Sequence, residues 1–372
     1  MTAAPSRAAS PGTSRPRRRV FSLDLIRALA TLIIVLTHVN NPFLTDGRYL
    51  LTNQPFGVYV GDLGVSLFLI VSGASLATTY HGPLNLRVFF WKRFKGIYPM
   101  FWIAWLLGTL YFFVDMGGHP LNVAPARSLI WTVLGVDGLV ANFGVHTAYL
   151  LGEWFLGFII LFYLVFPLLL AGVERWPKTT AAIILGLYLA SLYVLRDGAS
   201  FPSSVILTVR LPELVFGMYL VRYVTKVPPV VVVPALAMLV VTSVLVGTIP
   251  KDVATTAVGI SVFLILTVLA PWVQIGPVSE AVTLVSTYSY PVFLVHHVII
   301  YKLFLYSGLD YGSFYPVQLV VMLGVVCVLT LALAVALDRL TSRVVAMTAR
   351  AFAGRWWRPQ ALVTGPDQQE GR

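Results

Sequence analysis

Long apolar runs separated by short polar gaps recur along this chain from Leu23 to Leu337. A helix needs about 20 apolar residues to cross the hydrocarbon core of a bilayer. In lipid, only helices and closed β-barrels satisfy every backbone N–H and C=O group. The runs lack the strict alternation of apolar and polar positions that marks barrel strands. The pattern therefore predicts an all-α, polytopic transmembrane helix bundle.

About ten membrane-spanning helices are expected, within one transmembrane domain that covers residues 21–338. Residues 128–141 are apolar, but Gly135 and Asp137 interrupt them. We interpret this stretch as an interfacial or re-entrant piece of the loop 115–147. A disordered basic tail (1–20) and a basic cytoplasmic tail (339–372) are expected on either side of the domain. The predicted spans are 22–40, 57–79, 97–114, 148–171, 180–196, 204–222, 229–248, 253–271, 282–304 and 316–338.

Composition and charge support a membrane protein over a nucleic-acid-binding protein. Of the 372 residues, 58% are hydrophobic and 11% are charged, whereas soluble domains carry about 25% charged residues. The net charge of +11 suggests nucleic-acid binding at first, but the basic residues lie at the ends of apolar runs and in both termini. With ten spans and an inner N-terminus, 19 of the 26 Lys and Arg residues lie on the cytoplasmic side and 4 outside. This asymmetry supports ten helices with both termini in the cytoplasm. We expect an integral protein of the plasma (inner) membrane with no nucleic-acid partner.

Cysteine and histidine spacing gives no sign of a metal site. The single cysteine, Cys327, lies in an apolar stretch and permits neither an intramolecular disulfide nor a cysteine metal cluster. The histidines are scattered over several predicted helices, with no His-x-x-x-His pair. From spacing alone, we predict no metal.

Ionisable residues inside a membrane span are costly and mark functional positions. The first span holds Asp24, Arg27 and His38. Eleven helical steps of about 100° bring Arg27 and His38 to within about 20° of one face, about 16 Å apart. We expect both to face one interior seam, Arg27 near the cytoplasmic end and His38 near the outer end. The alternatives are that Arg27 snorkels or pairs with Asp24, and that His38 is an interfacial histidine bonded to a carbonyl.

Other polar residues fall at the depth of His38 in later spans. Arg210 and Glu213 are three residues apart, which allows a purely structural ion pair. Adjacent histidines on a helix point about 100° apart, so we expect one of His296 and His297 to face the site and the other to face lipid or the interface. A neutral histidine at this depth can act as a general base toward a hydroxyl. The outer-half ionisable residues are Asp62, Glu153, Arg210, Glu213, His296 and His297.

An arginine and a histidine with ten residues between them are followed, in order, by five further recognisable segments. These are Gly64–Gly73, Ile97–Pro99, Trp154–Pro167, Arg210–Gly217 and Ser289–His296. Together they resemble the integral-membrane acyltransferase-3 family over about residues 20–338, and the last segment favours His296 over His297. Two features depart from the family: Gly96 stands where a second arginine is common, and no acidic residue follows Trp154-Phe155-Leu156, although Glu153 precedes it.

The resemblance implies an enzyme that moves an acyl group, commonly acetyl from acetyl-CoA, onto a hydroxyl of a surface or exported glycan. Acyl-CoA would then be a cytoplasmic co-substrate, with no permanently bound cofactor. His38 would be a general base or an acyl relay, and Arg27 would orient the donor, with His296 and Glu153 as further catalytic candidates. The remaining candidates are Lys92, Arg93 and Lys95 for the CoA phosphates, and Asp24, Asp62, Ser72, Arg210 and Glu213 for substrate binding or structure.

Three alternatives are open at this stage. Lys92, Arg93 and Lys95 lie on the cytoplasmic side, where basic residues also serve as ordinary membrane anchors. The buried charges would equally suit a transporter or flippase for a glycan or lipid-linked intermediate. A membrane scaffold leaves the polar residues inside the spans without an explanation.

Overall fold

The computed structural model describes residues 20–40, 54–119, 123–151, 154–196, 198, 200–304, 308 and 314–356. Within these ranges every regular element is a helix, which confirms the predicted all-α class. All of the expected tail 1–20 except Val20 lies outside them, and so does Glu153.

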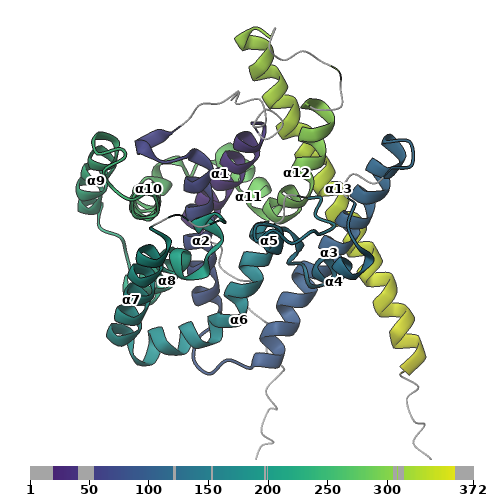
Figure 1. Ribbon diagram of the computed structural model, residues 1–372. Coiled ribbons are helices and arrows are strands. Elements are labelled where there is room, and N and C mark those ends of the chain that lie inside the picture. Colours follow the sequence, from purple (N-terminus) through teal and green to yellow (C-terminus); the bar gives the residue numbers. More distant parts are fainter. Residues whose placement is uncertain are drawn as a thin grey trace, which may run out of the picture.

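The helices stand side by side in a single bundle (Figure 1). Short 3-10 turns (η2 Pro55–Gly57, η3 Ala126–Ser128, η4 Ser203–Val205 and η5 Pro229–Val231) connect some of them. The α-helices are α1 (Phe21–His38), α2 (Val60–Thr79), α3 (Leu86–Asp115), α4 (Leu129–Leu134), α5 (Asp137–Ala141), α6 (Trp154–Arg175), α7 (Pro177–Leu195), α8 (Leu207–Tyr223), α9 (Val232–Val244), α10 (Lys251–Val273), α11 (Gly276–Thr287), α12 (Ser289–Phe304) and α13 (Pro316–Trp356).

Seven of the described helices, α1, α2, α3, α6, α7, α10 and α13, are each long and apolar enough to cross a membrane. The pair α11–α12, bent by 73°, passes the same test as one broken span. The segment Pro229–Val244 is a shorter apolar helix, and α8 has 17 residues. Each of the ten predicted spans thus coincides with a helix or with the bent pair, and the chain is an integral membrane protein.

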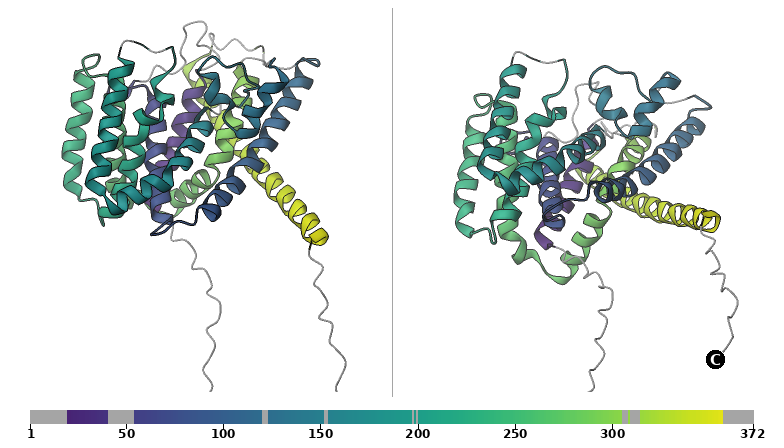
Figure 2. Two further views of the ribbon diagram at one scale, coloured as in Figure 1. Left: turned by 60° about the horizontal axis from the view of Figure 1, so that its bottom comes forward. Right: turned by 90° about the horizontal axis from the view of Figure 1, so that it is seen from below.

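Two segments differ in detail from the pattern of apolar runs. Helices α4 and α5, inside the loop 115–147, have six and five residues, far fewer than the roughly 20 needed to span. Helix α13 does not end at residue 338 but continues to Trp356, and its last turns project away from the bundle (Figure 2). The polar residues after 338 end the apolar run, but residues 339–356 contain no proline that would end the helix.

Helices α2 and α8 pack backbone against backbone at the centre of the bundle. A Cβ atom added at Gly73 would lie 1.9 Å from the carbonyl oxygen of Leu214, and one at Gly217 would lie 2.1 Å from that of Ile70. Small residues allow membrane helices to approach in this way. Helix α2 is accordingly the most deeply buried candidate span, and it presents one of its faces to the candidate site.

The bend between α11 and α12 turns the chain toward the same site. Pro291 lies in the first turn of α12, and a proline further inside a helix would clash with the carbonyl four residues earlier. A helix continuous with α11 is therefore disfavoured, and the two helices are separated at Tyr288. Ser289 and Tyr290 then begin α12 beside α1, with the Ser289 hydroxyl donating to the carbonyl of Ser286.

Candidate active site

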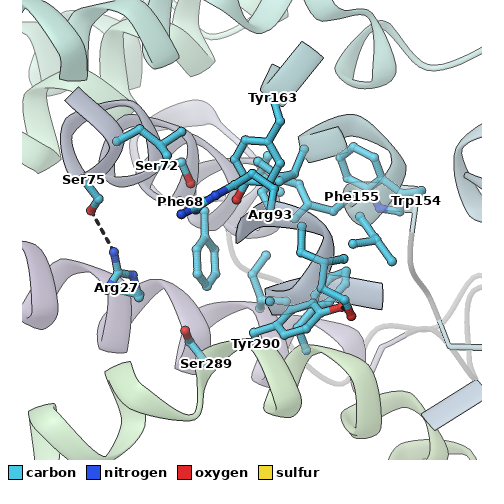
Figure 3. Close-up of a pocket in the computed structure, with 18 of the residues that line it drawn as sticks. Arg27, Phe68, Ser72, Ser75, Arg93, Trp154, Phe155, Tyr163, Ser289 and Tyr290 are labelled. Atoms are coloured by element: carbon cyan, nitrogen blue, oxygen red, sulfur yellow. Dashed lines mark hydrogen bonds between the residues drawn. The ribbon is translucent and has the colours of Figure 1, made fainter. Parts of the chain in front are cut away.

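A cavity of about 540 Å³ lies between α1, α2, α3, α6 and α12. Arg27 and His38 both contribute to its wall, as their spacing predicts. Figure 3 shows side chains from α2, α3, α6 and α12 around this space, together with Arg27 from α1. Its polar and aromatic lining residues are Arg27, Thr37, His38, Tyr59, Asp62, Phe68, Ser72, Ser75, Thr79, Lys92, Arg93, Trp154, Phe155, Tyr163, Ser289, Tyr290 and Phe293.

Arg27 is held by three neighbours while its side chain stays 27% exposed. One guanidinium nitrogen donates to the Ser75 hydroxyl at 2.8 Å (Figure 3). The other lies 3.4 Å from both Asp24 Oδ1 and the Ser286 hydroxyl, and Ser286 itself donates to Asp24 at 2.7 Å. Pairing with Asp24 therefore does not withdraw Arg27 from the cavity. It fixes the orientation of a cation on the cavity wall.

His38 and His296 form a direct hydrogen bond, with 2.7 Å between His38 Nδ1 and His296 Nε2. Nδ1 of His296 lies 2.7 Å from the Phe293 carbonyl oxygen and 3.2 Å from that of Val292. A carbonyl oxygen only accepts, so these contacts assign the proton of a neutral His296 to Nδ1. His296 Nε2 then accepts from His38 Nδ1. The unprotonated nitrogen of His38 is its Nε2, as a general base requires.

His297 joins the same cluster. Both His296 and His297 are buried, with 0% and 3% exposure. The His297 ring centroid lies 4.5 Å from that of His38 and 4.3 Å from that of His296. The expectation that one of the two would face lipid or the interface is therefore wrong. The angle of about 100° between adjacent helical residues fixes the directions of their Cα–Cβ bonds. The imidazoles of His296 and His297 extend beyond these bonds and can both reach the His38 ring from different sides.

Arg93 occupies the part of the cavity wall that α3 supplies. Its guanidinium carbon lies 5.5 Å from the Tyr163 ring centroid, 5.7 Å from Phe89 and 5.9 Å from Tyr80. It also donates to the Tyr80 hydroxyl at 3.3 Å. Its Nε is buried without a hydrogen-bond partner among the described residues. The aromatic faces stabilise the cation through their quadrupoles and hold it in place.

The other two basic candidates on α3 differ from each other. Lys92 also lines the cavity, whereas Lys95 does not. The Lys95 ammonium lies 5.5 Å from the ring centroid of the exposed Trp91. The structure therefore brings Lys92 and Arg93 to the site and leaves Lys95 outside the cavity wall.

Asp62 and Ser72 both line the cavity, but the Arg210–Glu213 pair does not. Arg210 Nε lies 3.1 Å from Glu213 Oε2, with side chains 2% and 0% exposed. Ser66 donates to Glu213 at 2.7 Å and accepts from Arg210 at 3.2 Å. This geometry favours the structural ion pair over substrate binding. Glu153 lies outside the described residues.

Two contacts of Arg27 were missed from the sequence. Ser75 follows Ser72 by three residues and shares its helix face. The spacing of the two serines could therefore have predicted that Ser75 faces the site together with Ser72. Ser286 carried none, because its position beside Asp24 depends on how α11 folds back against α1.

The bundle and its polar cavity define a polytopic integral membrane protein with a site buried between its helices. A family profile of the acyltransferase-3 type, described as an acyltransferase domain, matches residues 20–339. The chain belongs to the integral-membrane acyltransferase-3 family, and it is an acyltransferase. Comparison with curated proteins and with solved structures gives no match. Family membership favours the enzyme over the transporter and scaffold alternatives.

Proposed function

We propose that this membrane acyltransferase moves an acyl group, such as acetyl, from acyl-CoA to a hydroxyl of a glycan or other exported acceptor. The observation that carries the proposal is that Arg27 and His38 line one cavity together with Lys92 and Arg93. A cation for the donor and a base for the acceptor thus share one cavity. We place the protein in the plasma membrane, and the charge asymmetry of the loops supports an orientation with the donor on the cytoplasmic side.

In this proposal the donor enters past Lys92 and Arg93. Charge-assisted hydrogen bonds from an arginine and a lysine suit the phosphates of CoA. Arg93 is already oriented by three aromatic rings. The pantetheine arm then runs past Arg27, which holds the arm so that its thioester end reaches His38. Binding both reactants in a fixed geometry removes much of the entropic barrier of a bimolecular transfer.

Transfer begins when His38 Nε2 takes the proton of the acceptor hydroxyl. The oxygen attacks the thioester carbonyl, the C–O bond forms and the C–S bond breaks. The CoA thiolate leaves and takes the proton from the His38 imidazolium, so the base is regenerated. His296 accepts a hydrogen bond from His38 Nδ1, which holds the ring and stabilises its cationic form. In the alternative, His38 Nε2 attacks the thioester, a C–N bond forms and the C–S bond breaks with release of the CoA thiolate. The acceptor hydroxyl then attacks this acyl adduct, the C–O bond forms as the C–N bond breaks, and the hydroxyl proton goes to the thiolate.

A glycan acceptor is supported by the mixed lining of the cavity. Trp154, Phe155 and Tyr290 contribute aromatic rings to the wall. The hydroxyls of Ser289 and Tyr290 donate to the carbonyls of Ser286 and Ile97 and can still accept a hydrogen bond. Binding sites commonly combine an apolar wall with a few polar groups that fix orientation. Such a wall suits the apolar faces and hydroxyl edges of a sugar ring.

The test is transfer of label from acetyl-CoA to a glycan acceptor by the protein in lipid vesicles. His38→Ala should lower the rate by about 10²–10⁴-fold, the usual contribution of a general base. Arg27→Ala should also lower the transfer rate, because the donor is held less well. The matched control is His119→Ala, which changes an exposed histidine outside the cavity lining. If His38→Ala is folded and inserted normally but still transfers label at the wild-type rate, the proposed role is wrong.

A further inference from the structure

Three imidazoles from two helices lie close enough to share one ion. His38, His296 and His297 each offer a ring nitrogen, and these atoms all lie within 4.8 Å of one another. His38 comes from the end of α1, and the other two are neighbours on α12. Sequence spacing gave no sign of this group because it forms only when the end of α1 packs against α12.

The hydrogen bonds on the far side of two of the rings point the ligand atoms inward. Nδ1 of His296 faces the Phe293 carbonyl at 2.7 Å, and Nδ1 of His297 faces the Leu151 carbonyl at 3.1 Å. Each contact assigns a proton to Nδ1, so Nε2 carries the lone pair in both rings. Metal-binding histidines are commonly oriented by such a hydrogen bond from the other ring nitrogen to a backbone carbonyl.

We infer that His38, His296 and His297 form a binding site for a divalent transition-metal ion such as Zn²⁺. Neutral imidazole is a ligand that zinc prefers. Three histidines leave a fourth coordination position open for water. His38 also lines the large cavity, which gives an ion a route to the otherwise buried cluster.

The metal-bound and hydrogen-bonded arrangements exclude each other. Zn–N bonds of about 2.0–2.1 Å in a tetrahedral site separate the nitrogens by roughly 3.3 Å. His38 Nδ1 and His296 Nε2 are instead 2.7 Å apart, a hydrogen bond with the proton between them. If Nδ1 of His38 binds the ion, the neutral His38 ring must carry its proton on Nε2. Nε2 then has no free lone pair and cannot act as the base. The bound ion therefore inhibits the enzyme. This inhibition rests on the proposed function, whereas binding of the ion does not.

Binding is tested on the full chain in lipid nanodiscs, purified through a tag without histidine and given Zn²⁺ alone. After desalting, inductively coupled plasma mass spectrometry should find about one zinc ion per chain. X-ray absorption on the wild-type protein should show three imidazole ligands, and this readout needs no variant to fold. His297→Gln should weaken binding by at least about tenfold. His146→Gln, an exposed histidine outside the cluster, should leave binding unchanged.

The same preparations are then assayed for transfer from labelled acetyl-CoA. Zn²⁺ should inhibit the wild-type protein and the His146→Gln control, EDTA should restore both, and His297→Gln should resist inhibition. Absence of bound zinc, or binding that His297→Gln does not weaken, overturns the metal site. Zinc bound by three imidazoles in a protein that transfers no acyl group from acyl-CoA overturns the proposed function and leaves the metal site standing.

Discussion

At the scale of single residues, backbone carbonyls determine which ring nitrogen of His38 is unprotonated. The Phe293 carbonyl orients the Nδ1 proton of His296, and His296 in turn orients the Nδ1 proton of His38. The cavity-lining ring is then left with an unprotonated Nε2. His296 occupies the place that a carboxylate holds in the familiar hydrolase triads. A neutral acceptor suits a membrane interior, where an additional buried charge would be costly.

The Arg210–Glu213 pair leads to a residue-scale prediction about stability. Glu213→Gln leaves the Arg210 charge buried without its counter-ion, so the free energy of unfolding should fall by about 3–5 kcal/mol. The exposed Lys302–Asp115 pair, with side chains 42% and 26% exposed, is the matched control. Lys302→Gln should leave stability close to that of the wild-type protein, because ion pairs exposed to solvent contribute little. Denaturant titration in detergent micelles measures both.

Transfer per folded molecule should be unchanged in Glu213→Gln, because the pair does not line the cavity. A variant that keeps wild-type stability but loses transfer would place Glu213 in the site after all.

At the scale of helices, the contact between α2 and α8 fixes the face of α2 that carries Ser72 and Ser75. Gly73 lies between these two serines, and the backbone of Leu214 on α8 lies directly against it. Because the obstacle is backbone, no rotamer change can relieve an added side chain. The helix that supports Arg27 through Ser75 is therefore positioned by a glycine that faces away from the cavity.

Gly73→Ala should force α2 and α8 apart. We expect a loss of stability at or above the upper end of the roughly 1–3 kcal/mol typical of overpacking. Transfer should also fall, because Ser75 moves away from Arg27. Gly186→Ala on α7 is the matched control, since an added Cβ there meets nothing within 4 Å, and a helix interior gains from alanine. Thermal unfolding in micelles measures both, and equal melting temperatures for the two variants would contradict the close contact.

At the scale of the whole molecule, periodicity and charge predicted the bundle and the Arg27–His38 seam because both follow from local helix geometry. The apolar runs located every long helix, although polar residues after 338 hid the continuation of α13. The zone around His38 was less predictable. His297 reaches His38 only through packing of α12 against α1, and Ser286 reaches Arg27 at the other end of the seam only through packing of α11 against α1. Such packing leaves no periodic trace in a single sequence. Sequence spacing also left the role of Arg210 and Glu213 open, because residues three apart suit a structural ion pair and a substrate-binding site equally well.

Membrane topology provides the last prediction, since it depends on whether residues 128–141 cross the bilayer. Helices α4 and α5 are too short to cross, so Arg127 should lie outside and Lys178, after α6, should lie inside. The single native cysteine, Cys327, makes a cysteine-free background simple to build. On that background, a membrane-impermeant maleimide should label Arg127→Cys in intact cells and Lys178→Cys only after permeabilisation. Labelling of Lys178→Cys from outside would mean that the loop adds a span, and it would put the Lys92–Arg93 end and the C-terminus on opposite sides of the membrane.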